Sequence, residues 1–96
     1  MKILAIIDVA RGAPLDKVRE ELANEIRGAW HLLETGVLRE AYATASPTRV
    51  VFVLEADGAA AALEHLRRLP LVGAGLVHVE LVELKPFVNW SVLFEH

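Results

Sequence analysis

Apolar residues follow two periods along the chain, and the change of period predicts where strands alternate with helices. Segments 3–9 and 49–56 are apolar on both strand faces for nearly their whole length, as is typical of strands covered from both sides. Segment 37–44 is mixed on both faces, with Leu38, Glu40 and Tyr42 on one of them, which favours an edge strand. Segment 76–85 is expected to form a fourth strand, in which polar residues interrupt an apolar run.

Between these strands, apolar residues recur at steps of three and four, which predicts two amphipathic helices. The second helix is expected to begin at an Asp57 cap and to be closed by Pro70. A last segment, 87–96, repeats its aromatic and aliphatic residues at roughly helical spacing. The first helix covers about five turns and is expected to lay one stripe on the core, formed by Leu15, Val18, Leu22, Ile26, Ala29 and Leu33.

The order strand, helix, strand, strand, helix, strand is the βαββαβ plan of the α+β ferredoxin-like fold. Two right-handed crossovers place both helices on one face of a four-stranded antiparallel sheet. The other face would then be bare, although the first and third strands are apolar on both sides. We therefore expect a homodimer, or a higher homo-oligomer, packed sheet to sheet as an α+β barrel.

The composition supports one small domain that associates with itself. Its 96 residues suffice for one core, which we place in residues 1–87, and for a tail over 88–96 that docks on the domain or on a partner subunit. The apolar share of 54% exceeds the roughly 45–50% of an average soluble domain. An apolar excess of this kind favours a protein interface.

The charge pattern and the apolar runs exclude several classes of partner. Ten Lys and Arg residues are scattered among thirteen Asp and Glu residues, so we expect no nucleic-acid partner. The apolar run that starts at Ile3 ends at Asp8, too short for a secretion signal, and no segment approaches the roughly 20 apolar residues of a membrane span. With no cysteine in the chain, a cytoplasmic location without a membrane partner is the expectation.

Two stretches resemble a known family. They are residues 36–42, Gly-Val-Leu-Arg-Glu-Ala-Tyr, and the Leu-Pro-Leu of residues 69–71 followed by Glu80 in the last strand. On these stretches the chain resembles the muconolactone isomerase-like group of the dimeric α+β barrel superfamily over essentially its whole length. The resemblance implies homo-oligomers of ferredoxin-like protomers, no metal or organic cofactor, and a small pocket between sheet and helices or inside the barrel.

His78 and Glu80 are the candidate catalytic residues. They are two positions apart on one strand, so they share a face and could act as acid and base over an apolar floor. A proton shift next to a carbonyl needs such groups, with pKa values moved by burial. The structural alternative is a solvated sheet edge or the rim of a dimer.

Four further residues are candidates for substrate binding. Arg39 could hold a carboxylate with both arms of its guanidinium, although an intersubunit salt bridge explains it equally well. Tyr42, on the face opposite Arg39, could point its hydroxyl into a pocket. Asp8 ends a central strand, and His31 lies near the end of the first helix, where a surface position favoured by the helix dipole is the alternative.

These residues favour a small cofactor-free isomerase or cyclase that moves a proton on a hydrophobic ring or lactone-like substrate. Two alternatives stay open: a noncatalytic dimeric module that binds a small molecule, and a monooxygenase of the same superfamily, for which no axial histidine can be nominated. The four histidines, at positions 31, 65, 78 and 96, show no metal-ligand spacing, and we expect no metal.

Overall fold

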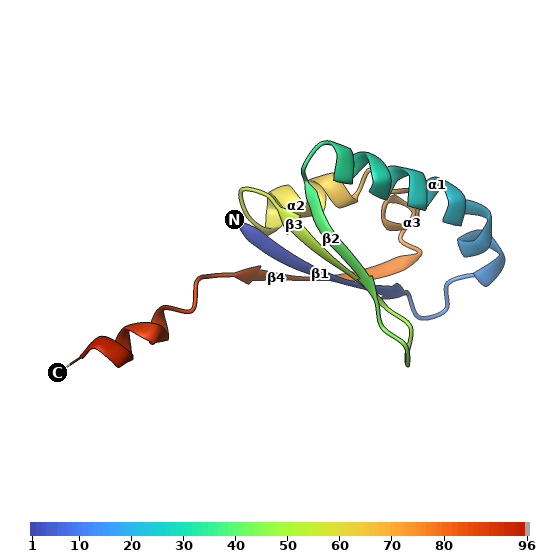
Figure 1. The fold of residues 1–96 in the computed structure, drawn as a ribbon. Helices are drawn as coiled ribbons and strands as arrows, with labels where there is room; N and C mark the ends of the chain where they lie inside the picture. Colours follow the sequence, from blue (N-terminus) through green and yellow to red (C-terminus); the bar gives the residue numbers. More distant parts are fainter. Residues whose placement is uncertain (96) are drawn as a thin grey trace.

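The computed structural model describes residues 1–95, and its elements follow the expected order (Figure 1). The strands are β1 Lys2–Val9, β2 Leu38–Ala43, β3 Val50–Glu55 and β4 Val77–Leu84. The helical elements are α1 Leu15–Glu34, α2 Ala59–Leu66, the short α3 Pro70–Gly73 and the 3₁₀ helix η1 Val88–Phe94.

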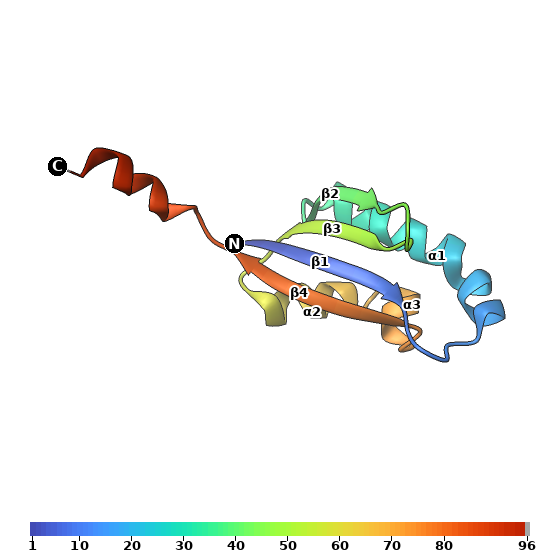
Figure 2. The ribbon, with the colours of Figure 1, turned by 90° about the horizontal axis from the view of Figure 1, so that it is seen from below.

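The four strands form one open antiparallel sheet in the order β2-β3-β1-β4. Figures 1 and 2 show α1, α2 and α3 together on one side of this sheet, while the chain leaves the other side uncovered. The predicted α+β class with a four-stranded antiparallel sheet is thereby confirmed, and the arrangement is compatible with a ferredoxin-like fold.

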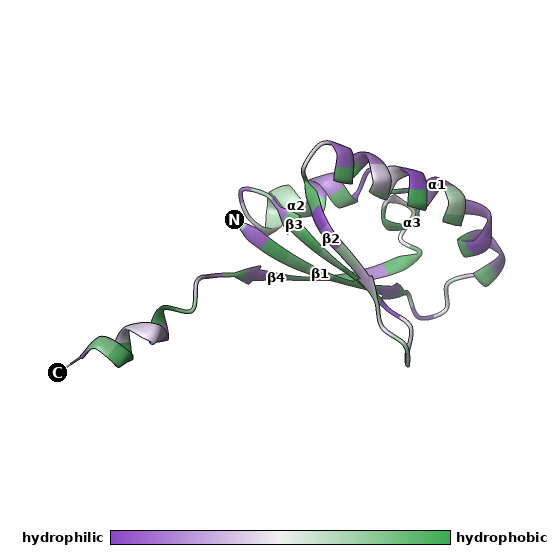
Figure 3. Ribbon diagram, viewed as in Figure 1, coloured by the Kyte–Doolittle hydropathy of each residue, from purple (hydrophilic) through white to green (hydrophobic). Residues whose placement is uncertain are grey.

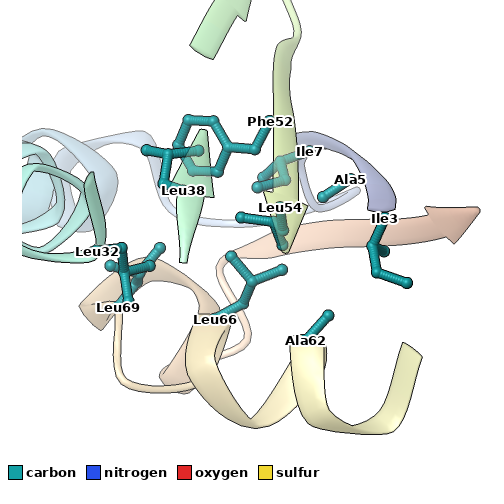
Figure 4. Close-up of a cluster of buried hydrophobic side chains, with 10 residues drawn as sticks. All are labelled: Ile3, Ala5, Ile7, Leu32, Leu38, Phe52, Leu54, Ala62, Leu66 and Leu69. Atoms are coloured by element: carbon teal, nitrogen blue, oxygen red, sulfur yellow. The ribbon is translucent and has the colours of Figure 1, made fainter. Parts of the chain in front are cut away.

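The core lies between the sheet and the helices (Figure 4). Along β1 the alternate residues Ile3, Ala5 and Ile7 point into it and are buried. Each Ile or Leu side chain withdrawn from water there contributes about 1.5–3 kcal/mol. The other members of the cluster are Leu32, Leu38, Phe52, Leu54, Ala62, Leu66 and Leu69.

A β-bulge in β2 overturns the alternation expected for segment 37–44. Leu38 pairs with Leu54 and Glu40 with Val53, so Arg39 is an extra residue without a partner across the ladder. Leu38 is therefore buried on the helix side. Its expected position on the same face as Glu40 and Tyr42 is wrong, because the bulge shifts the register by one residue.

The ends of the second helix also differ from expectation. Gly58 occupies the N-cap position of α2, and no side chain of the cap residue bonds to the helix, so Asp57 does not have the predicted role. Instead the N–H of Ala59 donates to Oε2 of Glu83, 3.3 Å away on β4. Pro70 does not simply close α2. It begins α3, where its fixed φ suits the first turn.

Helix α1 packs on the core with only part of its apolar stripe. Leu32 is its one buried residue, whereas Leu22 and Ile26 keep 47% and 62% of their surface exposed. The expectation that the whole stripe lies on the core is therefore wrong for the earlier turns, and also for Leu33, which stays exposed while its neighbour Leu32 enters the core. In the earlier turns the helix stands over an open cleft.

The tail extends away from the rest of the chain. Figure 1 shows η1 pointing outward beyond the end of β4, and Figure 3 shows that apolar residues dominate it. The predicted helical spacing matches η1, a 3₁₀ helix. Docking on the chain's own domain is not observed, docking on a partner stays a prediction, and residue 96 lies outside the described residues.

Candidate functional site

The space beneath the first turns of α1 forms a cleft of about 390 Å³. It opens at the end of the sheet where β1 finishes and β4 begins. Apolar side chains make up most of its wall, among them Val18, Leu22, Ile26, Phe52 and Val77. A volume of this size is typical of pockets that hold a small molecule.

Glu25 is the acidic group that α1 contributes to this wall. It lies three residues after Leu22 and four before Ala29, on the face of the helix that lines the cleft. The backbone N–H of Leu71 donates a hydrogen bond of 2.8 Å to Glu25 Oε1. Because Leu71 is in the first turn of α3, this N–H has no partner within its own helix.

The surroundings of Glu25 raise its pKa above the ordinary value of 4.5. Burial is the main cause, since it disfavours the charged carboxylate. The hydrogen bond from Leu71 lowers the pKa in part, and the negative charge of Glu21 raises it. A carboxyl whose pKa is raised by burial in an apolar wall is a candidate to accept and return a proton.

Asp8, Thr48 and Arg49 also border the cleft, whose surface is almost entirely apolar. The side chain of Asp8 itself shares the uncovered face of the sheet with its cross-strand partner His78. Asp8 is half-buried at the end of β1, and Arg49 is exposed just before β3. Within residues 1–95, ion pairs join Met1 to Glu55 and Arg67 to Glu64. Among the described residues, neither pair includes Arg49 or Arg39, the residue to which the sequence assigned carboxylate binding.

The structure places His78 and Glu80 on the face of the sheet that the helices leave uncovered. Cross-strand partners share a face, and Glu80 pairs with Ile6 while His78 pairs with Asp8. The predicted shared face of His78 and Glu80 is thus confirmed. Both side chains are exposed and neither lines the cleft. Their catalytic part stays a prediction that depends on a second copy covering this face.

Arg39, Tyr42 and His31 also lie outside the cleft. The Nε–H of Arg39 donates to the carbonyl oxygen of Gly36 at 2.6 Å. The Tyr42 hydroxyl donates to Glu40 Oε1 at 2.7 Å, and this bond, together with the negative charge of Glu40, raises the pKa of the tyrosine. His31 is exposed on α1 and lines a separate depression of about 270 Å³.

Of the six predicted site residues, Asp8 alone lines the cleft. Sequence analysis missed Glu25, although a signal was present. The apolar stripe of the first helix includes Leu22 and Ala29, and a carboxylate between them faces the same way. An ionisable residue inside an apolar stripe marks a candidate site.

Among residues 1–95, no three His, Asp or Glu side chains gather closely enough to hold a metal ion. In the same part of the chain, no helix combines the length and the apolar character needed to cross a membrane. Comparison with models of known protein families and with curated proteins finds no match for this chain.

Proposed function

We propose that this chain is a homodimeric protein that binds a small, largely apolar ring compound beneath α1 and moves a proton on it with the Glu25 carboxyl. One observation carries the proposal: Glu25 is a half-buried acid with a raised pKa in the apolar wall of a cleft of about 390 Å³. Perturbed ionisable groups in apolar clefts are the usual attributes of acid and base catalysis.

The reaction class is the shift of a double bond in a lactone-like ring. The Glu25 carboxylate takes a proton from the carbon next to the carbonyl, which leaves a dienolate, and the resulting acid returns a proton to the far end of the conjugated system. No electrons leave the substrate, so this isomerisation needs no redox partner.

The proposal extends to the fold and its partner. The strand order and the one-sided helices support a ferredoxin-like domain. Its assignment to the muconolactone isomerase-like group rests on the sequence resemblance of residues 36–42 and 69–71. On the uncovered face, apolar side chains from the two central strands lie together: Leu4, Ile6, Val51 and Val53. An apolar sheet face of this kind supports a homodimer packed sheet to sheet, and our proposal places this dimer in the cytoplasm. His78 and Glu80 would then lie at or inside the shared interior.

A simple butenolide, α-angelica lactone, tests the reaction. Its conversion to the conjugated β isomer is followed by ultraviolet absorbance. We expect the protein to accelerate this conversion, the Glu25→Gln variant to lose the acceleration, and the Glu20→Gln variant, changed at an exposed position of α1, to retain it. Equal rates for wild type and Glu25→Gln would remove Glu25 from the mechanism.

The hydrogen bond between Leu71 and Glu25 favours a second candidate, a noncatalytic binding module. In that case the carboxylate holds α3 against α1 and shapes the cleft without reacting. An aromatic carboxylate such as 1-naphthoate would then raise the melting temperature of the protein, and the butenolide would be left unchanged. The two assays separate the candidates, because proton transfer is required only by the first.

A further inference from the structure

The tail, residues 86–95, carries apolar side chains that its own domain does not cover. Six of them are exposed: Phe87, Val88, Trp90, Val92, Leu93 and Phe94. The 3₁₀ helix η1 has about three residues per turn, so Phe87, Trp90 and Leu93 lie along one side. The rings of Phe87 and Trp90 already pack edge to face, with their centroids 4.9 Å apart. The tail thus presents an ordered apolar ridge without a partner.

The tail starts at the wrong end of the sheet to reach its own cleft. Val77, at the start of β4, lines the cleft, and the eight residues of β4 carry the chain about 26 Å from it. The seven residues of η1 span about 14 Å. Figure 2 shows η1 continuing away from the domain at the end opposite the α1 turns that roof the cleft. The ridge therefore needs a surface on another molecule.

A two-fold dimer that packs the uncovered sheet faces together supplies that surface. When the two-fold axis lies in the interface and is perpendicular to the strands, the rotation reverses the direction of every strand. The Leu84 end of β4 in one copy then lies beside the Val77 end of β4 in the other. The tail then emerges next to the second copy's cleft. When the sheet faces cover each other, the apolar surface of α1 around Leu22, Ile26 and Trp30 stays open beside the cleft.

We infer that the tail of one copy closes the α1 cleft of a second copy, with the ridge of Phe87, Trp90 and Leu93 packed on Leu22 and Ile26. The inference rests on the proposed homodimer, but it does not require that the cleft be catalytic. The chain's cleft is then incomplete alone, since the second copy supplies its outer wall. Closure excludes water from the cleft and shields Glu25.

Paramagnetic labelling tests the contact directly, because the chain contains no cysteine and one introduced thiol carries the only label. Protein that is enriched in ¹⁵N and carries no nitroxide is mixed with ¹⁴N protein that bears a nitroxide at Val92→Cys. Signal loss in this mixture comes only from contacts between copies. We expect the amide signals of Leu22 and Ile26 to lose most of their intensity. A nitroxide at Ala60→Cys, on the exposed side of α2, serves as the control and should spare them.

Sedimentation of the same samples separates the possible failures. A monomer mass would overturn the homodimer and this inference together. A dimer in which the Val92→Cys label broadens only signals of the uncovered sheet face, such as Ile6 and Val51, would overturn both this inference and the sheet-to-sheet packing, but would leave the cleft beneath α1 in place. A dimer with no broadening on α1 would also overturn this inference.

Discussion

The backbone N–H of Leu71 donates a 2.8 Å hydrogen bond to Oε1 of Glu25, which lies 46 residues earlier in the chain. This bond connects the roof of the cleft, α1, to the first turn of α3. It satisfies an N–H that the short helix cannot satisfy internally. The same residue lines an apolar cleft and has a raised pKa. One side chain therefore both holds α3 against α1 and carries the proposed proton transfer.

Two substitutions at Glu25 both remove its charge but differ in whether the hydrogen bond from Leu71 can still form, so comparing them isolates the contribution of the bond. Glutamine keeps an oxygen that can accept from Leu71, whereas alanine removes the acceptor, and neither carries a charge. We expect Glu25→Gln to be more stable than Glu25→Ala by about 1 kcal/mol, the usual worth of such a bond. Urea unfolding measures the difference. Equal stability of the two variants would contradict a structural part for the bond.

The raised pKa of Glu25 predicts how stability varies with pH. Between the ordinary value of 4.5 and the higher value in the fold, the folded chain binds the proton more tightly than the unfolded chain. Stability contributed by this group is therefore present below pH 4.5 and is lost as pH rises through the folded pKa. Because Glu25 is only half-buried, solvent screens part of this effect and the loss is small.

Glu25→Gln provides the control for this pH effect, since the other ionisable groups are common to both proteins. The stability of wild type minus that of Glu25→Gln should fall as the pH rises above 4.5 and then level off. Unfolding by urea at a series of pH values measures it. A difference that rises with pH would mean that the carboxylate is stabilised in the fold and that burial is not the dominant influence.

Much of the fold could be predicted from the period of the apolar residues. The buried alternation of Ile3, Ala5 and Ile7 fixes β1, because each of these side chains must leave water on the same side. The bulge at Arg39 could not be predicted, since its extra residue leaves no mark in the apolar pattern. The beginning of α3 at Pro70 was missed because proline suits both the end of one helix and the first turn of another.

The site was less predictable than the fold. The two-residue spacing of His78 and Glu80 was enough to place both side chains on the same face of β4. It could not tell whether that face is the one covered by the helices, because this depends on how the whole sheet packs. Glu25 could have been found, since it interrupts an apolar helical stripe. The cleft itself could not, because it exists only where α1 stands away from the sheet, leaving Ile26 62% exposed.

Substitution of Ile6 by lysine tests the sheet-to-sheet dimer. Ile6 lies on the uncovered face between Val51 and Glu80, so an ammonium there would be buried in the proposed interface. We expect dissociation to become easier by about 3 kcal/mol, or about 100-fold in the dissociation constant. Sedimentation equilibrium measures it, with Ala60→Lys on the exposed side of α2 as the control. An unchanged dimer would place the interface elsewhere.

Gly73, the last residue of α3, tests the close approach of this helix to the backbone that follows α2. A Cβ added to Gly73 would lie 2.8 Å from the carbonyl oxygen of Arg67, and this backbone atom cannot move aside as a flexible side chain could. We expect Gly73→Ala to destabilise the fold by about 1–3 kcal/mol, as overpacking does. Thermal unfolding measures the loss. Wild-type stability would show that α3 can move away from the Arg67 carbonyl without cost.

The most direct measurement of the central claim is a titration of ¹⁵N-labelled protein with 1-naphthoate, an apolar ring that carries one carboxylate. If the cleft beneath α1 is the binding site, the amide signals of Leu22, Ile26 and Leu71 shift together and saturate, and the Glu25→Gln variant shows the same pattern. Shifts confined to the uncovered sheet face around His78 and Glu80, or no saturable shift at all, would contradict the assignment of the cleft.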